Sequence, residues 1–132
     1  MQRTRRERGA AAVELALLLP LIALLLVGIM EFGFAFYIQG ALAGAARTGV
    51  RSYSINYSTT DSTVDATAQA SARALAVAAT PEPAKAAVTS LIKCTAVGAQ
   101  TTLVVTYQYS SLTGWFGNTM TLTGKGTMRC AG

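Results

Sequence analysis

The chain has 132 residues, of which 52% are hydrophobic and only 13% are charged, so it is neither a disordered protein nor a typical soluble one. Its net charge of +5 is concentrated at the start, because four arginines against one glutamate give residues 1–9 a charge of +3. The other basic residues are scattered, which argues against a nucleic-acid-binding surface. Histidine is absent, and the three acids after residue 51 show no spacing that suggests acid–base work. We therefore expect no enzyme activity, cofactor, metal or small-molecule substrate.

A long apolar segment follows the basic start. Residues 15–30 are uninterrupted apolar residues, and with residues 32–38 they provide the roughly 20 residues that cross a bilayer. Because the basic residues precede this segment, the positive-inside rule places the N-terminus in the cytoplasm and the rest of the chain outside. A secretory signal peptide cut near residues 41–43 is the alternative, but its apolar core would be only roughly 7–15 residues long. We predict a single-pass membrane protein with its membrane segment at about residues 15–38.

The helical pattern continues beyond the membrane segment. A helix over residues 10–51 would be about 63 Å long, roughly twice the hydrocarbon thickness of a bilayer. Small and aromatic residues recur between residues 32 and 45 at three- and four-residue spacing, which indicates a packing face for another helix or for the chain's own domain. Pro20 is expected to kink the helix, because its ring displaces a backbone hydrogen bond.

Glu14 is the unusual residue of the N-terminal segment. A carboxylate deep in a bilayer costs a few kcal/mol on insertion scales, so Glu14 needs a partner or a place near the interface. In the simpler interpretation it lies at headgroup depth in an ordinary anchor. In the interpretation that we favour, the chain is cut after Gly9, and Glu14 neutralises the new ammonium group on Ala10, on the same chain or on a neighbouring subunit.

Three further charged residues have two interpretations each. Glu31 lies about 25 Å along the helix from Glu14 and is expected to mark the outer membrane boundary, although it could also pair with a basic group of a partner. Arg47 and Arg51 lie on one helix face around Gly49. They could bind carbonyls at the helix end, outer-leaflet headgroups or acidic partners, and the helix-end role is the one we favour.

The remainder of the chain predicts a small α+β domain. Residues 52–61 form a polar connection, and residues 62–65 fit a capping box that opens an alanine-rich helix. One side of that helix would consist of Val64, Ala68, Ala72, Leu75 and Ala79. Pro81 and Pro83 end it, and residues 84–91 would add a turn or a short helix.

The C-terminal third changes to a period of two. Alternating residues in 101–110 and 119–130 predict two half-buried strands, and a shorter strand near 92–97 would precede them. The first turn would lie at residues 98–100 and the second loop at 111–118. Residues 52–132 would then form a helix or two packed on a three-stranded antiparallel meander.

Cys94 and Cys130 lie outside the membrane in this topology, where a disulfide can persist. An intramolecular bond is favoured, but a strand that begins near Cys94 would place the two cysteines at opposite ends of a simple meander. Either the strand is differently placed, or the outer strands are neighbours, or the bond is not intramolecular. Trp115 and Phe116, in the second loop, either fold back onto the sheet or contact a partner subunit or the membrane surface.

The N-terminal segment resembles the TadE-like family, the minor pilins or pseudopilins of the tight-adherence (Tad) type IV pilus system. The resemblance lies in GAAAVELALLLPLIALLLVGIMEFG and ALAGAARTGVR, with the specific pieces being Gly9 with Glu14, the Leu19–Pro20 step, Glu31-Phe32-Gly33 and residues 45–51. It is strong over residues 8–51, weak over 52–90 and moderate over 101–130. Major pilins of this system tend to have tyrosine after the glutamate, and Leu15 at this position favours a minor subunit.

The resemblance implies a structural role. A prepilin peptidase in the bacterial inner membrane would cut between Gly9 and Ala10, and the mature subunit would support assembly of an adhesion pilus with other pilin or pseudopilin subunits. Glu14, Leu15, Pro20 and Glu31 would be assembly residues. Residues 1–9 would then be a cytoplasmic leader, 10–51 the assembly helix and 52–132 the extracytoplasmic domain. The alternative is an uncleaved, membrane-anchored scaffold or binding protein of the cell envelope.

Overall fold

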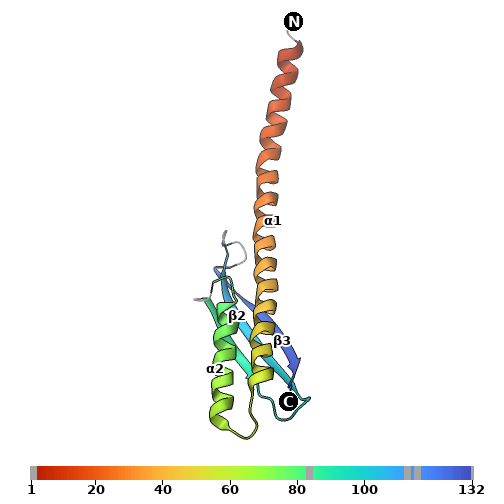
Figure 1. The fold of residues 1–132 in the computed structure, drawn as a ribbon. Coiled ribbons are helices and arrows are strands. Elements are labelled where there is room, and N and C mark those ends of the chain that lie inside the picture. The colour runs from red at the N-terminus through yellow and green to blue at the C-terminus, as the bar shows by residue number, and fades with distance from the viewer. Residues whose placement is uncertain (1–2, 83–84, 112–113, 115–116, 132) are drawn as a thin grey trace. The chain divides into compact units, whose positions relative to one another are not determined.

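The computed structural model describes residues 3–82, 85–111, 114 and 117–131, with side chains from Gly9 onward. Along the chain it contains α1 (Arg3–Asn56), α2 (Ser62–Ala78), β1 (Ala86–Ile92), β2 (Gln100–Ser110) and β3 (Thr119–Arg129) (Figure 1). The chain divides into two compact units, Met1–Phe34 and Ala35–Gly132, and α1 contributes to both. The predicted α+β fold, a long N-terminal helix with a small antiparallel sheet, is confirmed.

The first unit is one apolar helix with exposed hydrophobic side chains. Leucine and alanine, which are strong helix formers, dominate its sequence, and the helix continues through Pro20. Its large hydrophobic side chains between Val13 and Met30 are 44–73% exposed. Among the described residues, α1 is the one helix that is long and apolar enough to cross a membrane, with a mean hydropathy of 2.7 in its most apolar window.

The second unit is a three-stranded antiparallel meander with helices on one face. The strand order is β1-β2-β3, and β2 pairs with β3 along its full length, from Gln100 opposite Arg129 to Ser110 opposite Thr119. Figure 1 shows the C-terminal part of α1 and all of α2 lying side by side on this sheet. The core between the layers contains alternate residues of β2 and one face of each helix: Leu103, Val105, Tyr107 and Tyr109, with Ile38, Leu42, Ala46, Val50 and Tyr53 from α1 and Ala68, Ala72 and Ala76 from α2.

Two glycines of β3 allow α1 to lie directly on the strand. A Cβ atom at Gly126 would come within 2.6 Å of the carbonyl carbon and oxygen of Ala46, and one at Gly124 would overlap the backbone of Leu42. Glycine inside a strand often marks such a close backbone approach. The Gly-x-Gly step in β3 therefore fixes where the helix crosses the sheet.

The predicted start of the second helix was wrong by one residue. Asp61 is the N-cap, and its Oδ1 accepts hydrogen bonds from the backbone N–H groups of Thr63 (2.9 Å) and Val64 (3.3 Å). Asp65 is turned into the core and does not close a capping box. The buried stripe consequently shifts: Ala68 and Ala72 are buried as predicted, whereas Val64 and Leu75 are 48% and 46% exposed.

The segment before β2 was also predicted incorrectly. Residues 86–92 form β1, where a turn or short helix was expected, and the strand expected near residues 92–97 is absent from this described part of the chain. Leu91 pairs with Leu103, and the register shifts between Val88 and Ser90. The alanine-rich start suggested helix, but the apolar and β-branched residues at 88–92 fit a strand beside β2, and such tertiary pairing overrides local preference.

Candidate functional site

The predicted processing junction lies on α1. Gly9, Ala10, Glu14 and Leu15 are all helical and exposed, and nothing lies within 4 Å of the position that a Cβ of Gly9 would take. Ala10 and Glu14 are four residues apart, which places them on one helix face, one turn from each other. The spacing therefore suits a contact between a free ammonium group at residue 10 and the Glu14 carboxylate.

Pro20 and Glu31 occupy different environments on the same helix. Pro20 lies inside the apolar stretch and does not interrupt the helix. Glu31 is only 4% exposed, in contrast to its exposed neighbours Phe32 and Gly33. Its expected position at the outer membrane boundary stays a prediction.

The helix-end role predicted for Arg47, Gly49 and Arg51 was wrong, because α1 continues to Asn56 and its last turn contains no basic residue. Arg47 and Arg51 are exposed. Gly49 is a packing residue: a Cβ at this position would lie 2.7 Å from the carbonyl oxygen of Ala72 and from the Cβ of Ala76, both on α2. Glycine at residue 49 thus allows the two helices to touch.

The disulfide between Cys94 and Cys130 is present, with its Cα atoms 5.9 Å apart. The geometric difficulty disappears because β1 ends at Ile92, so that Cys94 follows this strand instead of starting it. In an up-down-up meander the first and third strands run in the same direction, so both finish at the same end of the sheet. Cys130 follows β3 directly, and its backbone N–H donates to the carbonyl of Ala99 (2.8 Å) in the intervening turn.

A buried polar network next to the disulfide was missed at the sequence level. The Tyr53 hydroxyl donates to Oδ1 of Asp65 (2.8 Å) and accepts from the backbone N–H of Cys94 (3.2 Å). The other carboxylate oxygen of Asp65 accepts from the side chain of Gln69 (2.7 Å) and lies 3.6 Å from Nζ of Lys93. Burial, and then the hydrogen bond to Asp65, raise the pKa of Tyr53 above its ordinary 10.0. The network therefore joins α1, α2 and the segment after β1.

One signal in the sequence pointed to this network. Asp65 lies three residues before Ala68 and seven before Ala72, so it falls on the predicted buried stripe of α2. A carboxylate on such a stripe requires hydrogen-bond partners. The sequence does not identify Tyr53 as that partner, because Tyr53 lies on the other helix.

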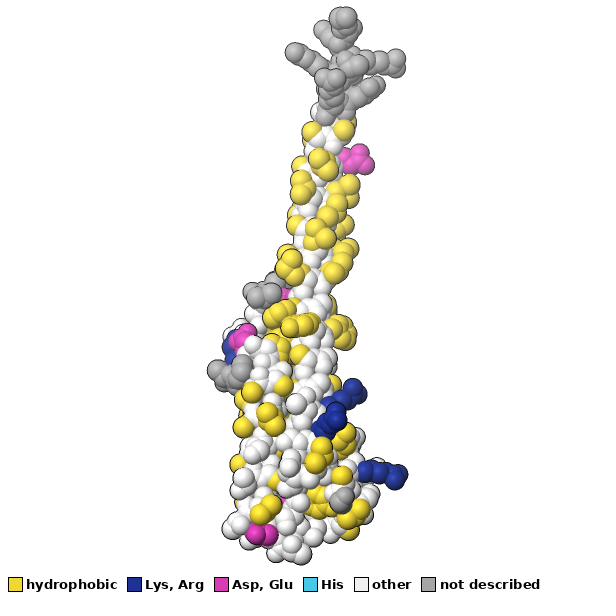
Figure 2. All heavy atoms as spheres, in the orientation of Figure 1, with side chains coloured by type: hydrophobic (Ala, Val, Ile, Leu, Met, Phe, Trp, Pro, Cys, Tyr) yellow, Lys and Arg dark blue, Asp and Glu magenta, His cyan; other side chains and the backbone are white. Residues whose placement is uncertain are grey.

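The surfaces of the two units differ in chemistry. Figure 2 shows mostly hydrophobic side chains on the coloured part of the helix of the first unit, whereas Lys and Arg side chains protrude from the domain. In the described part of the chain, no group of three or more His, Cys, Asp or Glu residues could hold a metal ion. Trp115 and Phe116, the predicted partner contact, lie outside the described residues.

Residues 9–51 match a family model described as TadE-like protein. Over these residues the N-terminal helix is similar to the TadE-like family. The match confirms the resemblance. It covers less than half of the chain and lies entirely within α1. No curated protein and no solved structure matches the chain. The matched segment includes the junction, the exposed apolar stretch and most of the part of α1 that packs on the sheet.

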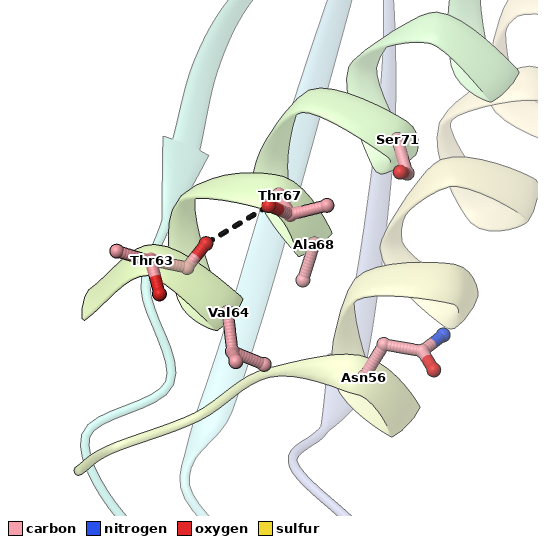
Figure 3. Close-up of a pocket in the computed structure, with 6 residues that line it drawn as sticks. All are labelled: Asn56, Thr63, Val64, Thr67, Ala68 and Ser71. Carbon is pink, nitrogen blue, oxygen red and sulfur yellow. Dashed lines mark hydrogen bonds between the residues drawn. The ribbon is translucent and has the colours of Figure 1, made fainter. Parts of the chain in front are cut away.

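A groove of about 490 Å³ lies where α1 ends beside α2. Asn56, Thr63, Val64, Thr67, Ala68 and Ser71 line it (Figure 3). Thr67 Oγ1 donates to the carbonyl of Thr63 (2.9 Å), and the amide of Asn56 donates to the carbonyl of Ser52 (2.8 Å). None of the six lining residues is titratable, so the groove offers no acid–base chemistry.

Proposed function

We propose that this protein is a minor pilin or pseudopilin that supports assembly of a Tad-type adhesion pilus. The observation that carries the proposal is the TadE-like match, which starts at Gly9 and runs through a helix whose apolar side chains are exposed from Val13 to Met30. A stretch of this kind needs lipid or other helices to cover it. In the proposed pilin, lipid covers this helix while it anchors the subunit in the membrane, and the helices of neighbouring subunits cover it after assembly.

The junction supports processing by a prepilin peptidase of the bacterial inner membrane. Cleavage between Gly9 and Ala10 removes a leader with a charge of +3, which holds the N-terminus on the cytoplasmic side. Glycine lowers helix stability by about 1 kcal/mol relative to alanine, so the turn around Gly9 unwinds more easily for the peptidase. The freed ammonium group of Ala10 then lies one helical turn from Glu14.

Mass measurement of the mature N-terminus, on protein isolated from the native bacterium, tests this proposal. A chain that begins at Ala10 supports the pilin, whereas an intact start at Met1 or Gln2 supports the alternative, an uncleaved membrane-anchored scaffold or binding protein of the envelope. A start near Gly44 would indicate a secreted protein released by a signal peptidase.

The structure argues against that last possibility. Ile38 and Leu42 are 1% and 0% exposed and belong to the domain core. A cut near residue 43 would remove both side chains from the core, and each loss of this size costs about 2–5 kcal/mol. Residues 35–43 of α1 are thus part of the folded domain.

A further inference from the structure

The segments that contain the disulfide are bonded to the last turn of α1, residues 53–56. Cys94 and Cys130 are only 7% and 2% exposed. Tyr53, which is 0% exposed, accepts the hydrogen bond from the backbone N–H of Cys94 (3.2 Å), and the carbonyl of Ser54 accepts from the N–H of Ala131 (3.0 Å). Two consecutive residues of α1 therefore hold the segments of both cysteines.

The bond to Ser54 has a specific physical origin. Because α1 ends at Asn56, the carbonyl of Ser54 has no acceptor role left within the helix, as is usual for the last four carbonyls. The N–H of Ala131 satisfies it. The end of the helix is thus attached to the C-terminal segment by a bond that local fraying of the helix would break.

Thiol–disulfide exchange requires a thiolate to reach a sulfur atom. To form this bond with glutathione disulfide as the oxidant, one cysteine thiolate attacks it and releases a glutathione thiolate. The second cysteine thiolate then attacks the mixed disulfide and releases the other glutathione, so two electrons pass to glutathione. In reduction, a dithiothreitol thiolate attacks one sulfur of the Cys94–Cys130 bond and releases the other cysteine thiolate. The second dithiothreitol thiolate then attacks the mixed disulfide and releases the remaining cysteine, so dithiothreitol is oxidised to its cyclic disulfide and gives up two electrons. Neither route is open to sulfur atoms that are covered on all sides.

We propose that the last turn of α1 is a strap that controls access to the Cys94–Cys130 disulfide. The strap opens locally, while the sheet stays paired, because the end of a helix frays more readily than the long ladder of β2 and β3 opens. The disulfide therefore forms before the strap closes over it, and in the folded protein it resists reduction until the strap opens. This inference does not depend on the proposed pilus function.

The rate of reduction tests the strap. Full-length oxidised protein in detergent micelles is mixed with dithiothreitol and iodoacetamide, and the mass increase reports the freed thiols. Tyr53→Phe removes the bonds to the N–H of Cys94 and to Asp65, and should raise the reduction rate about tenfold. Ala131→Pro, which removes the N–H that binds Ser54 and also restricts the backbone of Cys130, should raise it too. Tyr107→Phe is the matched control, because Tyr107 is also buried but belongs to β2. The reduction rate of this variant should rise only as far as its loss of global stability accounts for.

Low urea concentrations distinguish local from global opening. Opening of the strap exposes little surface, so the reduction rate should change little with urea below the unfolding transition. The proposal is overturned if the rate rises with urea as steeply as global unfolding does, or if the two Tyr→Phe variants accelerate reduction in proportion to their loss of stability. It is also overturned if both strap variants react at the wild-type rate, or if the wild-type bond is reduced as fast as an exposed disulfide.

Discussion

Tyr53 and Asp65 meet in the domain core, where the tyrosine hydroxyl donates a 2.8 Å hydrogen bond to the aspartate carboxylate. The two residues belong to different helices, and the same hydroxyl accepts the N–H of Cys94. Their contact thus links α1, α2 and the disulfide through one buried oxygen atom.

A double-mutant cycle should show this link. Tyr53→Phe and Asp65→Asn each remove part of the bond, and we expect a coupling free energy of about 2 kcal/mol, because one partner is a carboxylate in a desolvated site. Urea unfolding of the full chain in detergent measures it. Tyr57→Phe with Asp61→Asn is the control pair. The backbones of Tyr57 and Asp61 bond to Tyr53 and Asp65, but in the described structure no hydrogen bond joins the side chains that these substitutions change, so the coupling should be close to zero. Additive effects of Tyr53→Phe and Asp65→Asn would contradict the structural interpretation.

Substitution by alanine should have opposite effects on stability at a glycine that contacts α1 closely and at a glycine of α1 that has open space around it. Gly126→Ala would push a Cβ atom into the backbone of Ala46, which should cost about 1–3 kcal/mol of unfolding free energy, and more if the helix cannot shift. Gly44 is a helical glycine with open space around it, and Gly44→Ala should stabilise the isolated protein by up to about 1 kcal/mol. Thermal unfolding of both variants checks the signs. Equal destabilisation would mean that α1 does not cross β3 at these glycines.

The glycines also show what the sequence could predict of the fold. The alternation of Thr with apolar residues and glycine was sufficient to place β3 and its inward face. What the alternation does not contain is the identity of the element that covers this face, because any helix backbone would fit above Gly124 and Gly126. That choice depends on the length of α1 and on Gly49, which meets Ala72 of α2 at a distance that only glycine permits.

The residues of the candidate site also differ in whether the sequence alone draws attention to them. Gly9 and Glu14 stand out in the sequence alone, because a lone carboxylate in an apolar segment conflicts with simple anchoring, and their roles in processing and assembly stay predictions. The Tyr53–Asp65 network does not stand out, since it joins residues whose proximity exists only after both helices have packed. The same reason explains the misplaced first strand: residues 86–92 have weak preferences of their own and become a strand through pairing with β2.

The N-cap of α2 should make the domain sensitive to acid. Hydrogen bonds from the Thr63 hydroxyl, then from the backbone N–H groups of Val64 and Thr63, lower the pKa of Asp61 below its ordinary 3.8. A lowered pKa in the folded state means that this stabilisation is present above pH 3.8 and is lost as the pH falls through the folded-state value. The melting temperature should therefore drop below about pH 4.

A neutral cap separates this effect from the titration of the other acids. Asp61→Asn keeps a side-chain oxygen for the N–H groups but cannot be protonated in this range, so its melting temperature should fall less between neutral and acidic pH. Asp61→Ala should lower the melting temperature already at neutral pH. The assignment fails if Asp61→Asn loses as much stability in acid as the wild-type protein does.

Glu14 provides the test of assembly. In the proposed pilin, its carboxylate compensates the ammonium group of Ala10 in an apolar setting, where an unpaired charge costs a few kcal/mol. Glu14→Ala removes a charge from a membrane helix, so insertion should remain intact or improve. The ammonium group then lacks its partner when subunits associate, and electron microscopy of the cells should show fewer or no pili.

The leader contains the matched control. Glu7→Ala also removes one carboxylate from the start of the chain, but cleavage after Gly9 discards residue 7, so the mature subunit and the pili should be unchanged. Normal pili with Glu14→Ala would remove the assembly role from this residue, whatever the mature N-terminus proves to be. Loss of pili with Glu7→Ala, while residue 7 remains in the isolated protein, would favour the uncleaved scaffold. The two acids, seven residues apart, therefore separate assembly from processing, because only one of them stays in a processed subunit.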